Sequence, residues 1–90
     1  MKKILVVCGN GLGSSLILEM NVKRALGELG LEAEVSHTDL GSSKSEHADL
    51  YMGAEDIVGQ LDDGTRQVAA IPNLLDLNAI KRVLAQHLQA

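Results

Sequence analysis

Residues 4–20 read ILVVCGNGLGSSLILEM, and this stretch decides the fold class. Residues 3–8, KILVVC, predict a strand, because an unbroken apolar run is typical of a parallel strand that is covered on both faces. Glycines at positions 9, 11 and 13 follow, then two serines and an amphipathic segment. The chain's single cysteine, Cys8, ends the strand, so a lone thiol stands where a strand passes into a glycine loop and a helix.

The rest of the chain alternates strands and helices. Residues 14–29 predict a helix, because apolar residues recur at helical spacing and Gly30 is a suitable stop. A final helix, capped by Asp76, is expected to run to about residue 88. The other predicted elements are strands at 32–37, 48–53 and 67–71, a short helix at 55–61, and a loop with at most one helical turn at 39–47.

This order predicts one α/β domain over residues 1–90, with a four-stranded parallel sheet and helices on both faces. The alternating pattern of residues 32–37 favours an edge strand, so we expect the strand order 2-1-3-4, a flavodoxin-like or phosphatase-like open sheet. Right-handed crossovers then put the first and last helices on one face and the middle helix on the other. Cys8 is expected at the point where the winding direction reverses, which is where such sheets bind ligands.

Composition excludes several classes of function. The chain has 90 residues and a net charge of −4, and Tyr51 is its only aromatic residue, which argues against a nucleic-acid binder. Its apolar runs are too short to span a bilayer, and the glycines after Cys8 interrupt the apolar run too early for a signal peptide. One cysteine allows no internal disulfide, which favours the reducing cytoplasm. We expect no cofactor, and His37, His47 and His87 lack the spacing of metal ligands.

The glycine loop is predicted to bind phosphate, since backbone N–H groups and a helix dipole both favour an anion at such a turn. It lacks the lysine of a P-loop and the third glycine of a dinucleotide fingerprint. The remaining possibility is a cysteine inside an anion-binding loop, where the N–H groups and the helix dipole lower the pKa of the thiol. We therefore predict Cys8 as the catalytic nucleophile. The predicted phosphate-binding residues are Gly9, Asn10, Gly11, Leu12, Gly13, Ser14 and Ser15.

Low-molecular-weight cysteine phosphatases carry a similar loop, C-x5-R, in which the arginine grips the phosphoryl oxygens. Counted from Cys8, the arginine position is occupied by Ser14. A general acid for a leaving alcohol is not evident in the sequence either. The loop is therefore interpreted as one that receives and holds a phosphoryl group rather than one that hydrolyses its ester.

CGNGLGSS at 8–15, directly after KILVV, resembles the enzyme IIB proteins of the bacterial phosphoenolpyruvate-dependent sugar phosphotransferase system. The resemblance covers nearly the whole chain, and the residues of the motif are most similar to those of the ascorbate type within the lactose/cellobiose-like superfamily. It implies that a phosphohistidine of a IIA protein phosphorylates Cys8, which then passes the group to a sugar held by the membrane component IIC. It also implies a cytoplasmic protein that is peripheral to the inner membrane, and the span from Met1 to Ala90 favours a free subunit.

Several residues have a competing structural interpretation. Cys8 could be a buried core cysteine, Ser14 and Ser15 could cap the helix, and Asn10 could serve only the turn. Leu12 and Leu16 are predicted to dock the protein partners, while at least one of Leu16 and Met20 is expected in the core.

Other residues are expected to surround the loop. His37 could face the site, whereas Asp39 and Glu46 are expected in solvent. The loops at 39–47, 53–55 and 72–73 should border the site by topology.

Two alternative functions remain open at this stage. A phosphatase or arsenate reductase of similar fold requires Cys8-dependent hydrolysis of an aryl phosphate. A non-catalytic module that binds a phosphorylated partner requires that Cys8→Ser leaves the function intact.

Overall fold

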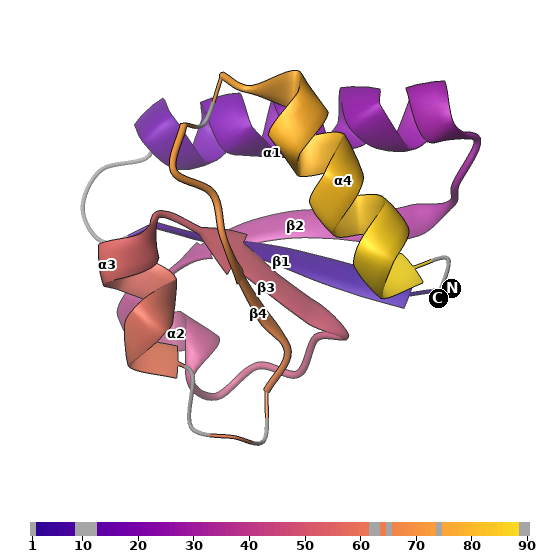
Figure 1. Ribbon diagram of the computed structural model, residues 1–90. Helices are drawn as coiled ribbons and strands as arrows, with labels where there is room; N and C mark the ends of the chain where they lie inside the picture. Colours follow the sequence, from indigo (N-terminus) through magenta and orange to yellow (C-terminus); the bar gives the residue numbers. More distant parts are fainter. Residues whose placement is uncertain (1, 9–12, 62–63, 65, 74, 89–90) are drawn as a thin grey trace.

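The structure is a computed structural model that describes residues 2–8, 13–61, 64, 66–73 and 75–88 (Figure 1). Its strands form one parallel sheet in the order β2-β1-β3-β4, so the predicted α/β topology is confirmed. The elements are β1 Lys2–Cys8, α1 Gly13–Leu29, β2 Ala33–Asp39, α2 Leu40–Ser43, β3 Leu50–Gly53, α3 Glu55–Val58, the 3-10 helix η1 Gly59–Leu61, β4 Val68–Ala70 and α4 Leu77–Leu88.

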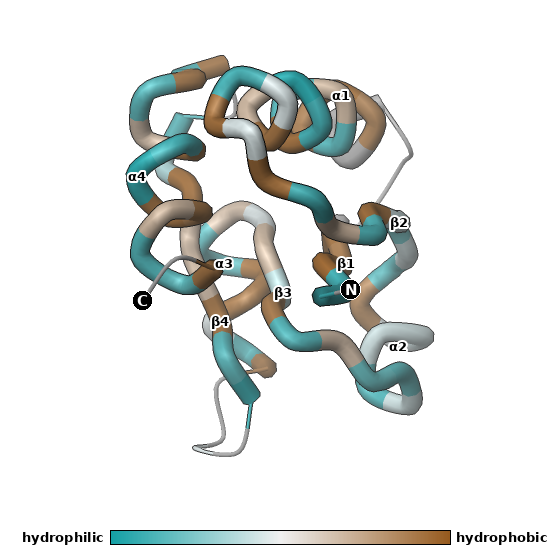
Figure 2. The backbone as a smooth tube through the Cα atoms, turned by 90° about the vertical axis from the view of Figure 1, so that its right-hand side faces the viewer, coloured by the Kyte–Doolittle hydropathy of each residue, from teal (hydrophilic) through white to brown (hydrophobic). Residues whose placement is uncertain are grey.

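Helices cover both faces of the sheet, in the arrangement that right-handed crossovers predict. Figure 1 shows α1 and α4 on one side of the strands, and α2 and α3 on the other. Alternate residues of the central strand β1 serve the two layers: Ile4 and Val6 pack under α1 and α4, while Leu5 and Val7 pack under α3. The part of β1 from Ile4 to Val7 is therefore apolar and buried, and Figure 2 shows brown, hydrophobic tube at β1.

Several predicted boundaries need correction. β3 begins at Leu50 rather than at residue 48, and β4 spans only Val68–Ala70 rather than 67–71. β2 continues to Asp39, two residues beyond the expected end, because it pairs with β1 along the full length of that strand. The segment at 55–61 tightens into a 3-10 turn at Gly59. The loop at 39–47 contains one helical turn, α2, as the sequence allowed, and the backbone N–H of Ser42 donates to Asp39 Oδ1 at 2.6 Å.

The two long helices are bounded as their sequences predict. Asp76 caps α4 through its Oδ1, which accepts from Ala79 N at 3.2 Å. Gly30 ends α1 with φ at +69°, while Leu31 N donates to Leu26 O at 2.9 Å, so the end is a Schellman motif. No helix within the described residues is both long enough and apolar enough to cross a membrane.

Gly27, inside α1, and Gly30, just after its end, should respond oppositely to alanine. Gly30→Ala places a Cβ at positive φ and should lower the free energy of unfolding by about 1 kcal/mol. Gly27 is helical and a Cβ there meets nothing within 4 Å, so Gly27→Ala should raise it by about 0.5–1 kcal/mol. Urea unfolding of both variants checks the pair, and two changes of the same sign would contradict the assignment of the helix end.

Candidate functional site

The candidate site lies at the carboxyl edge of the sheet, where the central strand β1 ends at Cys8. The backbone of Cys8 is paired with Asp39 of β2, and α1 begins five residues later at Gly13. Of the predicted phosphate-binding residues, Gly9, Asn10, Gly11 and Leu12 lie outside the described residues. Gly13, Ser14 and Ser15 form the first turn of α1. The predicted strand that ends at Cys8 and the helix that follows the loop are thus confirmed.

Helix α1 supplies the electrostatic character of this edge. It spans 17 residues and carries no acidic side chain in its first turn. The first four N–H groups of a helix lack intrahelical partners, and its aligned peptide dipoles leave a partial positive charge at the same end. The start of α1, next along the chain to the glycine loop after Cys8, can therefore favour a negatively charged group.

Gly53, the last residue of β3, lies where the loop at 53–55 was expected to border the site, but the sequence reasoning missed its packing role. A Cβ at this position would lie 2.5 Å from Val7 O and 3.0 Å from Val58 Cγ1. The missing side chain thus allows β3 to approach the last residues of β1, immediately before Cys8. In the sequence Gly53 is indistinguishable from a glycine that simply opens the next loop, because the close approach involves a strand more than 40 residues away.

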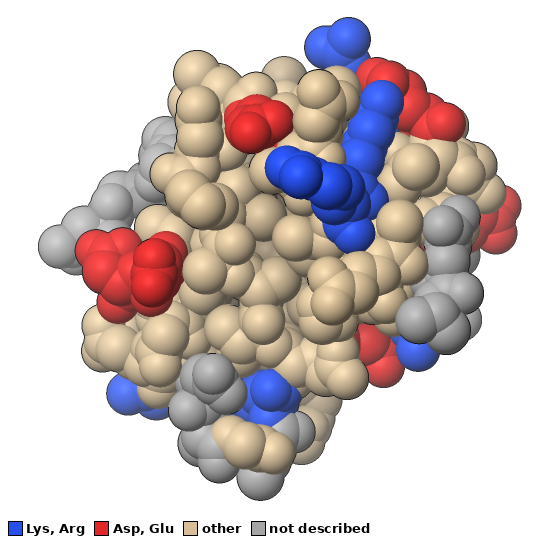
Figure 3. All heavy atoms as spheres, in the orientation of Figure 1, with Lys and Arg blue, Asp and Glu red and all other residues tan. Residues whose placement is uncertain are grey.

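Carboxylates accumulate along the described part of this edge. Asp39 is exposed, as expected, and the hydrogen bonds that it accepts from the backbone N–H and side chain of Ser42 hold the pKa of its carboxyl below the usual range. Glu55 and Asp56 occupy the first turn of α3, and Figure 3 shows acidic atoms gathered over this helix. In sequence, the segments 39–43, 53–56 and 71–76 contain no lysine or arginine. These segments therefore supply no substitute for the arginine of a phosphatase loop.

The loops after β3 and β4 form one wall of the edge, as topology predicts. Ala54, Asp56 and Pro72 are among the residues that line an open hollow of about 580 Å³ between the carboxyl ends of these strands. The hollow is shallow and its charge is acidic, so it is a poor candidate for a free anionic substrate. It leaves room instead for a second protein to approach the edge.

His37 is engaged on the α1 side of β2. Its Nδ1 lies 3.0 Å from Glu19 Oε1, and Lys23 Nζ lies 3.8 Å from the other oxygen of the same carboxylate. Glu19 lies in the second turn of α1, so this histidine ties the edge strand to the helix that follows the loop. The structure therefore gives His37 a structural partner.

The exposed face of α1 corrects one prediction. Leu16 is 44% exposed and Met20 is 69% exposed, so neither lies in the core, although at least one was expected there. Residues of a helix are 100° apart, and the buried stripe begins at Leu18 and continues at Val22, which turns Leu16 and Met20 outward. Ile17 is also 45% exposed, and Leu75, before α4, is 71% exposed. Leu16, Ile17 and Met20 are neighbours on α1, so we call these three side chains the apolar patch, and they mark a candidate contact area.

Comparison with known proteins agrees with this geometry. A family model described as "PTS system, Lactose/Cellobiose specific IIB subunit" matches residues 3–86. A relative from Mycoplasma pneumoniae, named "Ascorbate-specific PTS system EIIB component", is 31% identical over 86 residues, which cover 92% of this chain and 90% of the relative. Proteins of the same name from Salmonella typhimurium and Escherichia coli O157:H7 are each 36% identical over 76 residues, 81% of this chain and 75% of theirs. The resemblance carried by residues 8–15 is thereby confirmed over most of the chain.

Proposed function

We propose, from the premise that this chain belongs to the lactose/cellobiose-specific IIB subunits of the phosphotransferase system, that Cys8 is its phosphoryl acceptor. The chain is a phosphoryl-transfer subunit of that system, and its family works with a IIA donor and a membrane IIC component. The observation that carries the proposal is the place of Cys8: the only thiol of the chain ends the central strand, next to the loop that leads into α1.

The proposed chemistry consists of two displacements at phosphorus. The Cys8 thiolate attacks the phosphohistidine of IIA, so an S–P bond forms as the N–P bond breaks and the imidazole leaves. A sugar hydroxyl then attacks the phosphocysteine: an O–P bond forms, the S–P bond breaks, the thiolate leaves and the hydroxyl proton passes to solvent. The N-terminus of α1 favours both the thiolate and the phosphoryl group that replaces it. Gly9–Ser15 are proposed to donate hydrogen bonds to the phosphoryl oxygens.

A relay fits this edge better than a hydrolase. Ser14 occupies the position of the phosphatase arginine, and the neighbouring segments at the carboxyl edge carry no cation. The carboxylates of Asp39, Glu55 and Asp56 add negative charge around a phosphoryl group. Repulsion between these carboxylates and the phosphoryl group raises the free energy of the phosphocysteine. A higher free energy favours transfer of the phosphoryl group to the next acceptor.

We further propose ascorbate as the transported sugar, because the relatives described above are named for it. The sugar is expected in IIC rather than in this chain, since the hollow at the carboxyl edge is open and acidic. The chain is proposed to act in the cytoplasm, at the face of the inner membrane where IIC presents the sugar to Cys8.

The apolar patch is proposed as part of the surface that docks the partners. Leu16, Ile17 and Met20 lie in the first two turns of α1, next to the loop that follows Cys8. A partner that delivers a phosphoryl group to Cys8 must cover this end of α1. Burial of exposed apolar side chains can then stabilise the complex.

Polar substitution of the patch should weaken docking without unfolding the chain. Leu16→Gln/Met20→Gln should raise the concentration of phosphorylated IIA needed for half-maximal transfer by about tenfold, because two apolar contacts are lost. The swap Leu16→Met/Met20→Leu is the matched control and should stay near wild type. Initial rates over a range of IIA concentrations measure the effect. Equal half-maximal concentrations for the two double variants would show that the patch is not part of the interface.

Reconstitution tests the proposed acceptor directly. The purified chain is mixed with phosphoenolpyruvate, the general phosphotransferase proteins and an ascorbate-type IIA, and its intact mass is followed. We expect the chain to gain one phosphoryl group, carried by the peptide that contains Cys8. If its mass stays unchanged while the IIA protein is fully phosphorylated, the acceptor role is wrong.

A further inference from the structure

Glu19 is a largely buried carboxylate that the proposed chemistry does not use. Its side chain is only 12% exposed and lies in the second turn of α1. His37 Nδ1 of β2 lies 3.0 Å from its Oε1, and Lys23 Nζ lies 3.8 Å from its Oε2. An ionised carboxylate can only accept hydrogen bonds, so Nδ1 of His37 is the donor. Because a carboxylate withdrawn from water is costly to leave unpaired, the contact with His37 restrains α1 against β2.

The strand that carries His37 also carries the backbone partner of Cys8. β1 and β2 pair in parallel, and Cys8 is paired with Asp39, two residues after His37. On the other side, the chain leads from Cys8 to the start of α1 at Gly13, less than two turns before Glu19. The contact between Glu19 and His37 therefore closes a ring that runs from Cys8 through α1 to β2 and back to Cys8.

Apolar packing restrains this part of α1 less specifically. Leu18 and Val22 are buried in the same core as Ile4 and Val6 of β1. Hydrophobic packing is non-directional, so it favours burial of this face of α1 without fixing how far the helix reaches along the strands. A hydrogen bond has a narrow range of distance and angle, so the contact of His37 with the helix can supply that restraint.

We propose that Glu19 and His37 are positioning residues that hold the start of α1 beside Cys8 and thereby set the reactivity of its thiol. Both residues act through α1 on the proposed phosphoryl acceptor, so their role rests on the function proposed above. The N-terminus of a helix favours a thiolate only at short range, because its effect falls off within about one turn. A displacement of α1 would therefore make the thiol less reactive.

Alkylation of Cys8 by iodoacetamide tests this role without any partner protein. The rate follows the thiolate, and every added group reports Cys8 because the chain has no other cysteine. Intact mass gives the rate over a range of pH, and we expect the wild-type midpoint below about pH 8.5, the ordinary value for a thiol. His37→Ala and Glu19→Ala should each raise the midpoint by about 0.5 pH unit. His37→Asn should stay near the wild type, because its amide nitrogen is as many bonds from Cα as Nδ1 and can donate to Glu19.

The direction of the two shifts separates positioning from a direct effect of charge. If both side chains acted on the thiol only as charges, removal of the Glu19 carboxylate would lower the midpoint, whereas removal of a protonated His37 would raise it. Upward shifts in both alanine variants support the positioning role. Opposite shifts, an unchanged midpoint in either variant, or an ordinary midpoint in the wild type would overturn it.

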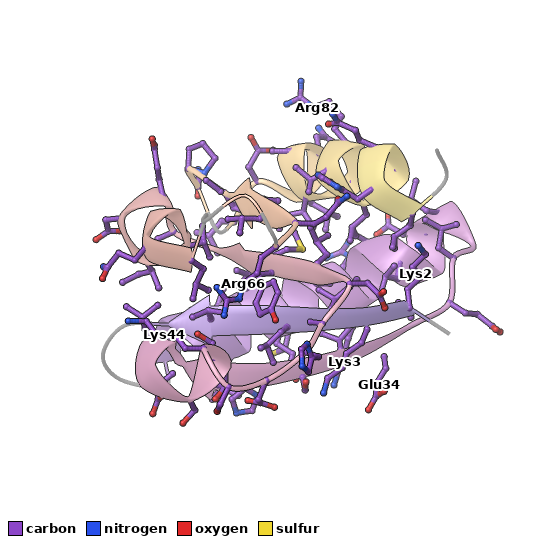
Figure 4. The ribbon with its side chains drawn as sticks, turned by 90° about the horizontal axis from the view of Figure 1, so that it is seen from below. Lys2, Lys3, Glu34, Lys44, Arg66 and Arg82 are labelled. Atoms are coloured by element: carbon purple, nitrogen blue, oxygen red, sulfur yellow. The ribbon has the colours of Figure 1, made fainter. Side chains whose placement is uncertain are left out.

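Two carboxylates away from this contact provide the controls. Glu28, in the last turn of α1, contacts Lys81 Nζ of α4 and accepts from Arg24 Nε at 2.9 Å, and these hydrogen bonds hold the pKa of its carboxyl below the usual range. Glu34 lies on β2 and is exposed, and Figure 4 shows its side chain pointing away from the neighbouring strands. Glu28→Ala and Glu34→Ala should both keep the wild-type midpoint. If Glu28→Ala shifts it as much as Glu19→Ala does, any loosening of α1 has the same effect and the specific role is wrong.

Transfer from phosphorylated IIA separates this role from the acceptor role of Cys8. His37→Ala should lower the maximal rate by about twofold, because less thiolate is present at a pH below the midpoint. The IIA concentration for half-maximal transfer should stay unchanged, since the apolar patch is untouched, and an effect on this concentration alone would contradict positioning. A wild type that accepts no phosphoryl group would refute the acceptor role, while the alkylation midpoints would still decide whether Glu19 and His37 position α1.

Discussion

The Cys8→Ser variant is expected to fold as the wild type does and to accept no phosphoryl group from IIA. Serine differs from cysteine by one atom, and the position ends a strand whose preceding residues, Leu5 to Val7, are at most 2% exposed and retain all their contacts. A hydroxyl is far less ionised than a thiol at neutral pH, so the nucleophile is lost although the loop and the start of α1 remain. The chain has no second cysteine to compensate. The measurement is intact mass after incubation with phosphorylated IIA, under conditions that phosphorylate the wild type completely.

Two further assays separate the remaining interpretations. Thermal unfolding of Cys8→Ser should match the wild type, which distinguishes loss of the nucleophile from loss of the fold. Hydrolysis of an aryl phosphate by the wild type, abolished in Cys8→Ser, would favour the phosphatase alternative. Sugar phosphorylation that persists in the variant would instead favour a regulatory module. Either result would contradict the proposal that Cys8 carries the phosphoryl group to the sugar.

The Gly53→Ala variant is expected to show the largest loss of stability among single changes near the site. Its Cβ would lie 2.5 Å from Val7 O, closer than side-chain atoms normally approach a carbonyl oxygen, and both partners belong to the buried sheet. β1 and β3 must move apart at their carboxyl ends, which should cost about 1–3 kcal/mol. Because Val7 directly precedes Cys8, the rate of phosphoryl transfer should also fall. Urea unfolding and the initial rate of transfer from IIA measure the two effects.

Gly59→Ala is the matched control for this prediction. Gly59 ends α3 with φ at −58° and ψ at −28°, and a Cβ there meets nothing within 4 Å. The substitution should therefore not lower the free energy of unfolding, and the transfer rate should stay close to that of the wild type. If Gly53→Ala behaves like Gly59→Ala, the close approach of β3 to Val7 is not a constraint on the site.

Most elements of the fold could be predicted because their signals are local. The apolar run before Cys8, the helical repeat of Leu18 and Val22, and the terminating Gly30 each lie within one element. Boundaries were less accurate where pairing decides them: β2 extends to Asp39 only because β1 supplies hydrogen-bond partners that far. The direction in which Leu16 and Met20 point also depended on which stripe of α1 meets the sheet.

The amino-acid sequence by itself determined the parallel topology, the place of the lone thiol at the end of the central strand and the family of the chain. These follow from periodicity, glycine spacing and an eight-residue motif, all of which are readable along the chain. Only the tertiary structure decided that Gly53 must lack a side chain and that His37 pairs with Glu19. The physical reason is that these relations join segments far apart in sequence, whose distances are set by strand register and helix packing.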